Sequence, residues 1–329
     1  MILEPILKSS DIITRYEGNP VLSGTDVPYT SDCVFNAGVT KYRGEYICVF
    51  RNDFDYKGGS VFGGTNLGLA RSADGLNWTV EKTPFFEKKQ IKDDEITRIY
   101  DPRLTVIEGT LYICFACDTR HGVRGGIGKV HDDLSGFDII SLSVPDNRNM
   151  VLFPEKINGM FARLERPMPV YSRGRDRFDT WISYSPDLKF WGESSLILGV
   201  EDVPYANDKT GPAAPPVKTE KGWLTLFHAV DIDKDRGKNG WEDTWKKRYC
   251  AGVMLLDSDN PSKVLGICKE PLMAPEALYE QGEGFRENVI FPGGMVLEEN
   301  GEVKIYYGAA DTVECLACAN VDDLVRLCL

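Results

Sequence analysis

The sequence has no long apolar run and a deficit of positive charge. Its longest apolar runs are strand-sized, and none approaches the ~20 residues that a membrane-spanning helix needs. Lys and Arg number 38 against 50 Asp and Glu, so the formal net charge is −12. This charge argues against nucleic acid and against anionic membranes as main partners. Residues 1–20 lack a basic segment followed by an unbroken apolar one, so we expect no signal peptide and a cytoplasmic protein.

Common catalytic motifs are also missing. The chain holds only three histidines, and it contains no Gly-x-Ser-x-Gly elbow, no HExxH pair and no Gly-x-x-x-x-Gly-Lys-Ser/Thr loop. A Ser-His-Asp hydrolase or a P-loop enzyme is therefore not expected.

The nine cysteines are an odd number, which indicates free thiols in a reducing compartment. Two C-x-x-C pairs occur, Cys114 with Cys117 and Cys315 with Cys318, and both lie in strand-like runs. Residues three apart in a strand point to opposite faces. We therefore expect neither pair to bind zinc, and the sequence indicates no metal and no organic cofactor.

Short runs of strand composition recur between clusters of Gly, Asp, Asn and Pro, and no long helical pattern occurs. The clearest runs are residues 45–52, 110–118, 178–185, 223–230 and 302–310. A similar Asp-containing turn follows each of them, at Asp74, Asp133, Asp187, Asp259 and Asp322, with spacings of 54 to 72 residues. An Asp side chain in such a turn can accept a hydrogen bond from the backbone two residues on.

A repeat of this length with several strands per copy is typical of a β-propeller. Asp-rich turns are common in β proteins, but five at near-even spacing favour the repeat. We predict an all-β, five-bladed β-propeller that forms a single catalytic domain over residues 1–329, with residues 1–30 helping to close the ring.

Three stretches interrupt the repeat and are expected as long loops. They are residues 200–217, residues 231–248 around Trp241 and Trp245, and residues 274–288. Long loops on a rigid scaffold commonly carry function. For 231–248, a substrate lid, a subunit contact and a solvated loop remain open.

Polar residues next to Pro and aromatic residues mark the ends of several predicted strands. They are Asn36, Arg51, Asn52, Asp101, Arg148, Arg163, Glu165, Arg166, Lys209, His228 and Asp311. Most fall on the innermost strand of a blade or just after it, so a propeller would bring them to the mouth of its channel. A carboxylate among several cations is a general arrangement for transferring a sugar or a phosphoryl group.

The sequence around these residues resembles the mannoside phosphorylases of glycoside hydrolase family 130. The motifs are IYDPRL (99–104), VLFPEK (151–156), RLERP (163–167), PPVKT (215–219), LFHAV (226–230) and YYGAADT (306–312). The resemblance is greatest to intracellular members that act on β-1,4-mannooligosaccharides or β-1,4-mannosyl-N-acetylglucosamine. It implies a five-bladed propeller, a homo-oligomer that is often a hexamer, and a phosphorylase of the glycosyltransferase type. Such enzymes use inorganic phosphate to release α-D-mannose 1-phosphate with inversion.

The resemblance also implies roles for individual residues. Asp101 matches the single catalytic acid, which passes its proton through a hydroxyl of the mannose. Positions that bind phosphate correspond to Arg148, Arg166, Lys209 and His228. Positions around the mannose correspond to Asn36, Arg51, Arg103 and Asp311. Tyr100 matches a position that faces the leaving sugar.

The chemistry of these residue types agrees with that assignment. An inverting hydrolase needs two carboxylates, one as acid and one as base for water. A phosphorylase needs only the acid, together with cations that bind the phosphate nucleophile. Two alternatives remain, a β-mannoside hydrolase on the same fold and a non-catalytic sugar-binding propeller. The sequence leaves open whether the leaving sugar is mannose, a longer mannooligosaccharide or N-acetylglucosamine.

Overall fold

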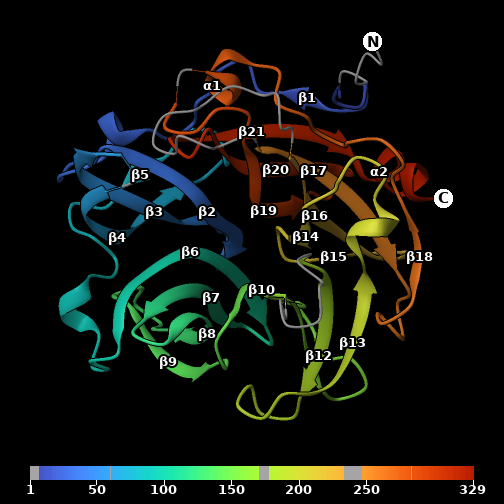
Figure 1. The fold of residues 1–329 in the computed structure, drawn as a ribbon, viewed down its shortest axis with the longest axis horizontal. Coiled ribbons are helices and arrows are strands. Elements are labelled where there is room, and N and C mark those ends of the chain that lie inside the picture. Colours follow the sequence, from blue (N-terminus) through green and yellow to red (C-terminus); the bar gives the residue numbers. More distant parts are fainter. Residues whose placement is uncertain (1–6, 60, 170–177, 233–246, 283) are drawn as a thin grey trace.

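The computed structural model describes residues 7–59, 61–169, 178–232, 247–282 and 284–329. Five antiparallel sheets surround a central axis, with β2, β6, β10, β14 and β19 innermost (Figure 1). The all-β, five-bladed propeller predicted from the repeat is therefore confirmed.

The sheets follow one another along the chain. The first two comprise β2 (Cys33–Tyr42), β3 (Glu45–Gly58), β4 (Val61–Ser72) and β5 (Thr79–Val80), then β6 (Ile96–Ile107), β7 (Thr110–Thr119), β8 (Gly122–Val130) and β9 (Phe137–Leu142). The third comprises β10 (Asn147–Leu152), β11 (Phe161–Pro167), β12 (Thr180–Ser185) and β13 (Gly192–Leu198). The fourth comprises β14 (Lys209–Pro212), β15 (Val217–Thr219), β16 (Gly222–Ile232), β17 (Lys247–Leu256) and β18 (Val264–Ile267). The fifth comprises β19 (Ile290–Leu297), β20 (Glu302–Ala309), β21 (Val313–Asn320) and β1 (Thr14–Arg15).

The N-terminal strand closes the ring. Thr14 and Arg15 of β1 pair with Cys318 and Ala317 of β21, so residues from both ends of the chain share the fifth sheet. The side chain of Arg15 also forms an ion pair of 2.7 Å with the buried Glu280 of helix α1 (Leu278–Gln281). The prediction that N-terminal residues help to close the propeller is confirmed.

The hydrophobic core lies between the blades rather than on the axis. Phe86, Phe115 and Phe137, for example, pack between the first two sheets. Cys114 and Cys117 belong to two different buried clusters, because residues three apart in β7 point to opposite faces. No helix in the described part of the chain is long and apolar enough to cross a membrane.

The predicted Asp turns follow the third strand of each sheet. The carboxylates of Asp74, Asp133 and Asp187 accept backbone N–H bonds there, as expected. In the fourth copy the acceptor is Asp257 and not Asp259. In the fifth copy Asn320 caps helix α2 (Val321–Cys328) by accepting from the backbone N–H of Asp322. In both copies the residue that accepts the hydrogen bond lies two positions before the predicted Asp, because these sequences offer several possible acceptors close together.

The three expected loops differ in outcome. Residues 200–217 are not simply a loop, since they contain β14, the innermost strand of the fourth sheet. The 274–288 stretch contains the single turn α1. Most of the 231–248 stretch, with Trp241 and Trp245, lies outside the described residues.

Candidate active site

The innermost strands of several blades are interrupted by β-bulges. The register shifts between Phe35 and Gly38 in β2, between Tyr100 and Arg103 in β6, between Arg148 and Val151 in β10, and between Pro292 and Gly294 in β19. Asn36, Asp101 and Asn149 occupy these bulges with φ of 51°, 52° and 59°. Asn and Asp enter this left-handed region more readily than most residues. A bulge redirects a side chain out of the normal alternation, and all three side chains line one cavity.

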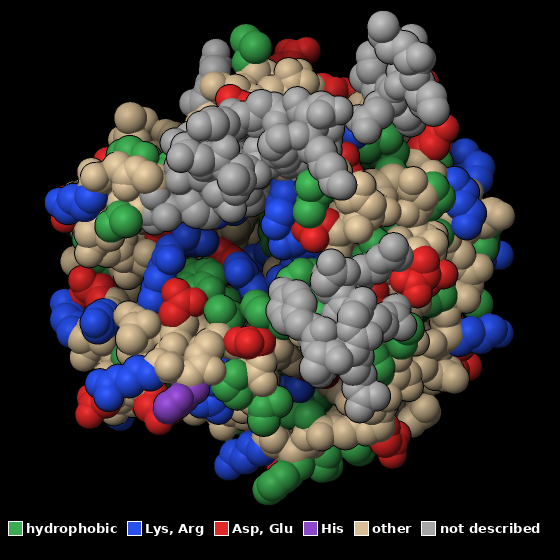
Figure 2. Space-filling model, in the orientation of Figure 1, with side chains coloured by type: hydrophobic (Ala, Val, Ile, Leu, Met, Phe, Trp, Pro, Cys, Tyr) green, Lys and Arg blue, Asp and Glu red, His purple; other side chains and the backbone are tan. Residues whose placement is uncertain are grey.

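This cavity has a volume of about 340 Å³ and opens among the ends of the inner strands. Its walls include eight of the residues selected from the sequence: Asn36, Arg51, Tyr100, Asp101, Arg148, Arg166, Lys209 and Asp311. Figure 2 shows Lys and Arg side chains gathered around a hollow near the centre of this face. The topology thus brings together residues that lie up to 275 positions apart in the chain (36 to 311).

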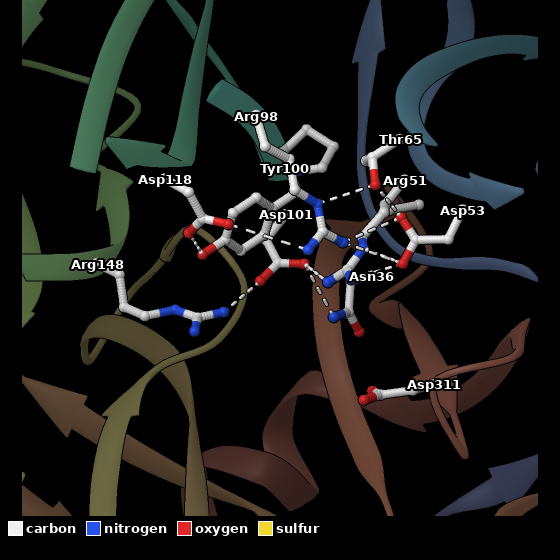
Figure 3. Close-up of polar contacts among 12 residues, drawn as sticks. Asn36, Arg51, Asp53, Thr65, Arg98, Tyr100, Asp101, Asp118, Arg148 and Asp311 are labelled. Carbon is white, nitrogen blue, oxygen red and sulfur yellow. Dashed lines mark hydrogen bonds and ion pairs between the residues drawn. The ribbon is translucent and has the colours of Figure 1, made fainter. Parts of the chain in front are cut away.

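The carboxylate of Asp101 contacts several polar side chains in this cavity (Figure 3). Its Oδ1 accepts hydrogen bonds from Nδ2 of Asn36 at 3.1 Å and from Nη1 of Arg51 at 3.2 Å. Its Oδ2 accepts from Nη2 of Arg148 at 2.7 Å. Two partners from the first blade and one from the third therefore hold the carboxylate of Asp101, which is on the second blade, at the channel mouth.

The electrostatics of Asp101 follow from these contacts. Burial on its own would raise the pKa of Asp101, because a low dielectric disfavours the carboxylate. The guanidinium groups of Arg51, Arg148 and Arg103 outweigh burial and hold the pKa of Asp101 well below its usual range. Asp101 is consequently ionised at neutral pH in this arrangement.

A second buried carboxylate, Asp53, was not selected from the sequence. Its Oδ2 accepts from Nη2 of Arg51 at 2.6 Å, and both of its oxygens accept from Nη2 of Arg98 at 3.1 Å. Thr65 donates to Oδ1 of Asp53 at 2.5 Å. Asp53 thereby fixes the guanidinium of Arg51 in its position against Asp101 (Figure 3).

Arg148, Arg166 and Lys209 form a cation cluster on the cavity wall. Burial and the charge of Arg148 lower the pKa of Arg166 to about 10, and burial and Arg166 lower that of Lys209. Within the described residues, Nε of Arg148 and Nε of Arg166 are buried without a hydrogen-bond partner. The cations repel one another and have donors to spare, which makes the cluster suited to an anion.

His228 lies behind this cluster and does not line the cavity. Its ring is fully buried, and Nε2 faces Nη1 of Arg166 at 2.9 Å. Its Nδ1 lies 3.2 Å from the carbonyl oxygen of Pro212. Burial, followed by the charges of Arg166 and Lys209, keeps the pKa of His228 well below its usual value. A neutral His228 therefore donates a hydrogen bond from Nδ1 to the carbonyl oxygen of Pro212 and accepts a hydrogen bond at Nε2 from the guanidinium of Arg166.

Arg103 is also behind the cavity wall. Its guanidinium donates to the backbone carbonyls of Ala213 (2.7 Å), Asn36 (3.1 Å) and Pro102 (2.7 Å). These bonds join the first, second and fourth blades near the axis. Similarly, Arg163 pairs with Glu165 at 2.9 Å and stays out of the cavity.

Several lining residues were missed by sequence reasoning. They are Phe62, Arg98, Asn149, Tyr249, Phe285, Arg286, Val289 and Phe291, together with Phe35, which precedes the predicted Asn36. Arg286 forms an ion pair of 3.2 Å with Asp311, a residue whose pKa is raised by burial and by Asp101. Phe285 and Arg286 belong to the 274–288 stretch, which the sequence had already marked as a long loop that could carry function.

Comparison with known proteins places this chain in a family. A family model described as beta-1,4-mannooligosaccharide phosphorylase matches residues 8–329. The β-1,4-mannooligosaccharide phosphorylase of Ruminococcus albus is 32% identical over 326 residues, covering 96% of this chain and 90% of its own. A β-1,2-mannobiose phosphorylase of Thermoanaerobacter sp. is 33% identical over 324 residues, covering 91% and 94%.

A solved structure agrees with these matches. The β-1,2-mannobiose phosphorylase from Listeria innocua, in complex with β-1,2-mannobiose, superposes with a TM-score of 0.79 at 27% identity, covering 96% of this chain and 98% of its own. The fold and these matches define a carbohydrate-active propeller enzyme. The chain belongs to glycoside hydrolase family 130, the family of mannoside phosphorylases.

Proposed function

We propose that the protein catalyses the inverting phosphorolysis of β-1,4-linked mannosides and releases α-D-mannose 1-phosphate. One observation carries the proposal: the buried acid Asp101 shares a cavity with the cations Arg148, Arg166 and Lys209. A sugar-binding module would have no need for a cation cluster beside a buried acid.

The cations supply what a phosphate nucleophile requires. Among the described residues, the buried Nε donors of Arg148 and Arg166 have no hydrogen-bond partner, and guanidinium groups bind phosphate oxygens through short charge-assisted bonds. A phosphate oxygen attacks the anomeric carbon as the bond to the leaving oxygen breaks. The leaving oxygen receives the proton of Asp101, relayed by a mannose hydroxyl. Phosphate needs no general base, because it is already an anion.

The remaining residues position these groups. Asn36, Arg51 and Asp311 would hold the mannose, since they surround Asp101 in the cavity. His228 and Arg103 act from behind the wall, where they fix the guanidinium of Arg166 and join the blades.

The β-1,4 linkage is the finer part of the proposal. It is supported by the description of the family model and by the relative from Ruminococcus albus. Relatives of similar identity are named for β-1,2-linked mannosides, so the linkage has to be measured.

The test is incubation with β-1,4-mannobiose, β-1,2-mannobiose and β-1,4-mannosyl-N-acetylglucosamine, each with and without inorganic phosphate. We expect α-D-mannose 1-phosphate from the β-1,4-linked substrates and only with phosphate, detected by ³¹P NMR. Faster reaction of β-1,2-mannobiose would contradict the linkage.

The alternative is hydrolysis at the same site. It is favoured by one observation, a second carboxylate in the cavity, Asp311, which could serve as base for water. Asp311 is already engaged by Arg286 at 3.2 Å, which favours a binding role. Free mannose produced equally with and without phosphate would decide for the hydrolase.

A further inference from the structure

The active-site cavity carries more positive than negative charge. Its lining contains the cations Arg51, Arg98, Arg148, Arg166, Lys209 and Arg286, but only the carboxylates Asp101 and Asp311. Nearby cations favour the ionised form of a carboxyl group. An acid catalyst has to hold its proton until it donates it, so this surplus of cations opposes the role proposed for Asp101.

Several strands bring titratable groups toward Asp101. They are Arg51 on β3, Tyr100 and Arg103 on β6, Arg148 on β10, Arg166 on β11 and Asp311 after β20. Against the effect of burial, Arg51, Arg148 and Arg103 lower the pKa of Asp101. A further negative charge near these arginines would make protonation of Asp101 easier.

Asp53 supplies such a charge from behind the cavity wall. Its side chain is fully buried and forms ion pairs with Arg51 at 2.6 Å and with Arg98 at 3.1 Å. On the neighbouring strands it faces Thr65 of β4, which donates to its Oδ1, and Cys33 of β2, a thiol whose pKa is raised to about 12 by burial. Burial alone would raise the pKa of Asp53, but Arg51, Arg98 and the hydrogen bonds lower it. Asp53 is therefore ionised at neutral pH.

Arg51 joins the two carboxylates (Figure 3). Its Nε and Nη2 donate to Oδ2 of Asp53 at 3.0 and 2.6 Å, whereas its Nη1 donates to Oδ1 of Asp101 at 3.2 Å. Arg98 is also held by Asp53, since its Nη2 donates to both oxygens of that carboxylate at 3.1 Å. The buried carboxylate thus partly neutralises two arginines of the cavity wall.

We propose that Asp53 is a positioning residue for general acid catalysis, which neutralises Arg51 and Arg98 so that Asp101 can take up the proton that it donates. This inference rests on the proposed function. Asp53 is not among the residues that line the cavity, so it acts through Arg51 and not by contact with a substrate. Phosphate bound to Arg148 would neutralise a third cation in the same way.

Asp53→Asn tests the charge of this residue. The amide keeps the size of the side chain and an oxygen that can accept from Arg51, but it has no negative charge. Arg51 and Arg98 should then favour ionised Asp101 more strongly, and activity requires the protonated form. At saturating phosphate, we expect the high-pH limb of the kcat/KM profile for the mannoside to move to lower pH by about one unit. Above that limb, kcat/KM should be about tenfold below the wild-type value.

A double variant distinguishes charge from structure. Arg98→Met removes one cation and keeps a long side chain, so the limb should move to higher pH. Asp53→Asn combined with Arg98→Met removes both members of the ion pair and should return the limb toward the wild-type position. Thr65→Val is the matched control, because it removes a hydrogen bond from Asp53 but no charge, and it should leave the limb in place.

Each outcome bears on the inference. A misplaced Arg51 would raise KM for the mannoside without moving the limb, and the double variant would not reverse that loss. A limb that stays in place or moves to higher pH in Asp53→Asn would overturn the inference alone. If that variant does not fold, Arg98→Met decides, and an unmoved limb there would overturn the inference. A wild-type protein that phosphorolyses no mannoside would overturn the proposed function, and the inference with it.

Discussion

Arg148 donates from Nη2 to Oδ2 of Asp101 at 2.7 Å, and the same guanidinium belongs to the proposed phosphate site. Phosphate and Asp101 would compete for the guanidinium of Arg148, because a phosphate bound to Arg148 offsets the positive charge that stabilises the Asp101 carboxylate. Asp101 is held ionised mainly by Arg51 and Arg148 against the effect of burial, although an acid must carry a proton to donate one. Binding of phosphate should therefore raise the proton affinity of Asp101 at the stage when the proton is needed.

Asp101→Asn tests the acid itself. The amide keeps the shape of the side chain but has no proton to transfer, and general acid catalysis typically contributes about 10²–10⁴-fold. We expect kcat to fall by about that factor. Loss of a negative charge beside Arg148 should at the same time tighten phosphate binding several-fold, measured by calorimetry with inorganic phosphate. Near-normal turnover by the folded variant would remove Asp101 from the catalytic role.

Arg148→Ala tests the coupling between phosphate and the acid. Removing this cation should raise the pKa of Asp101, because an opposite charge close by lowers a carboxyl pKa by about 1–3 units. Activity requires protonated Asp101, so the high-pH limb of the kcat/KM profile should move to higher pH. Phosphate affinity should drop by about 10- to 150-fold, the value of a charge-assisted hydrogen bond.

Arg166→Ala is the matched control for that variant. Arg166 belongs to the same cation cluster, but among the described residues its Nη1 faces Nε2 of His228 rather than the carboxylate of Asp101. It should weaken phosphate binding to a similar degree and shift the pH limb much less. Equal shifts in the two variants would show that the Arg148–Asp101 contact has no special role.

The pH dependence of phosphate binding tests the charge state of His228. The pKa of His228 is well below 6.5, since burial and the charges of Arg166 and Lys209 disfavour its protonation. Phosphate affinity should therefore show no His-dependent loss as the pH rises from 6 to 8, once the titration of phosphate itself is subtracted. His228→Ala should weaken phosphate binding by about tenfold through the misplaced Arg166. A wild-type affinity that falls with a midpoint near pH 6.5 would indicate a charged His228 on the phosphate.

The stability of the propeller should depend on Glu314. This buried residue accepts from the backbone N–H of Ala37, next to the Asn36 bulge, at 3.1 Å. Burial raises the pKa of Glu314 to about 8. The native state binds this proton more tightly than the unfolded chain does. The contribution of Glu314 to the free energy of unfolding should therefore be largest below about pH 4.5 and should fall as the pH rises to about 8. Glu314→Gln removes the titration and should stabilise the protein at pH 8 by roughly 1–4 kcal/mol relative to wild type.

Thermal unfolding of both proteins between pH 5 and pH 9 measures this effect. The difference in melting temperature should grow with pH and be smallest at pH 5. A difference that is constant across the range would mean that Glu314 does not change its protonation in the native state.

Much of the fold and part of the site could be predicted from the sequence. Strand composition and the near-even spacing of five Asp-containing turns predicted the five blades, although the accepting residue lies two positions earlier than predicted in the fourth and fifth copies. The strand ends that carry Asn36 and Asp101 were found because polar residues interrupt apolar runs there. The repeated topology of the blades then brings these strand ends together at one mouth of the central channel.

The rest depends on register and on packing between blades. Asp53 and Arg98 meet only because β3, β4 and β6 lie side by side, which no local pattern specifies. Whether His228 faces the cavity or lies behind Arg166 depends on the alternation along β16, and a one-residue change would reverse it.

Tyr100 connects the active-site cavity to the choice of leaving sugar. Its ring is buried, and its centre lies 4.7 to 5.3 Å from the guanidinium carbons of Arg51, Arg98 and Arg148. Burial raises the pKa of Tyr100 to about 12, so its hydroxyl remains a neutral donor to Asp118 at working pH.

Tyr100→Phe should therefore act through Asp118 as well as through the ring. Without the hydroxyl, Oδ1 of Asp118 loses the hydrogen bond that Tyr100 donates, and the carboxylate becomes a stronger acceptor for the leaving sugar. A sugar with a free hydroxyl at its second carbon can donate to it, whereas an N-acetyl group also brings an apolar methyl that a carboxylate disfavours. We expect the ratio of kcat/KM for β-1,4-mannobiose over β-1,4-mannosyl-N-acetylglucosamine to rise about three- to tenfold, the range of one net hydrogen bond.

Asp118→Asn in the Tyr100→Phe background should return the ratio toward wild type, because the amide lacks the negative charge. An unchanged ratio together with a lowered melting temperature would assign Tyr100 to packing between the blades.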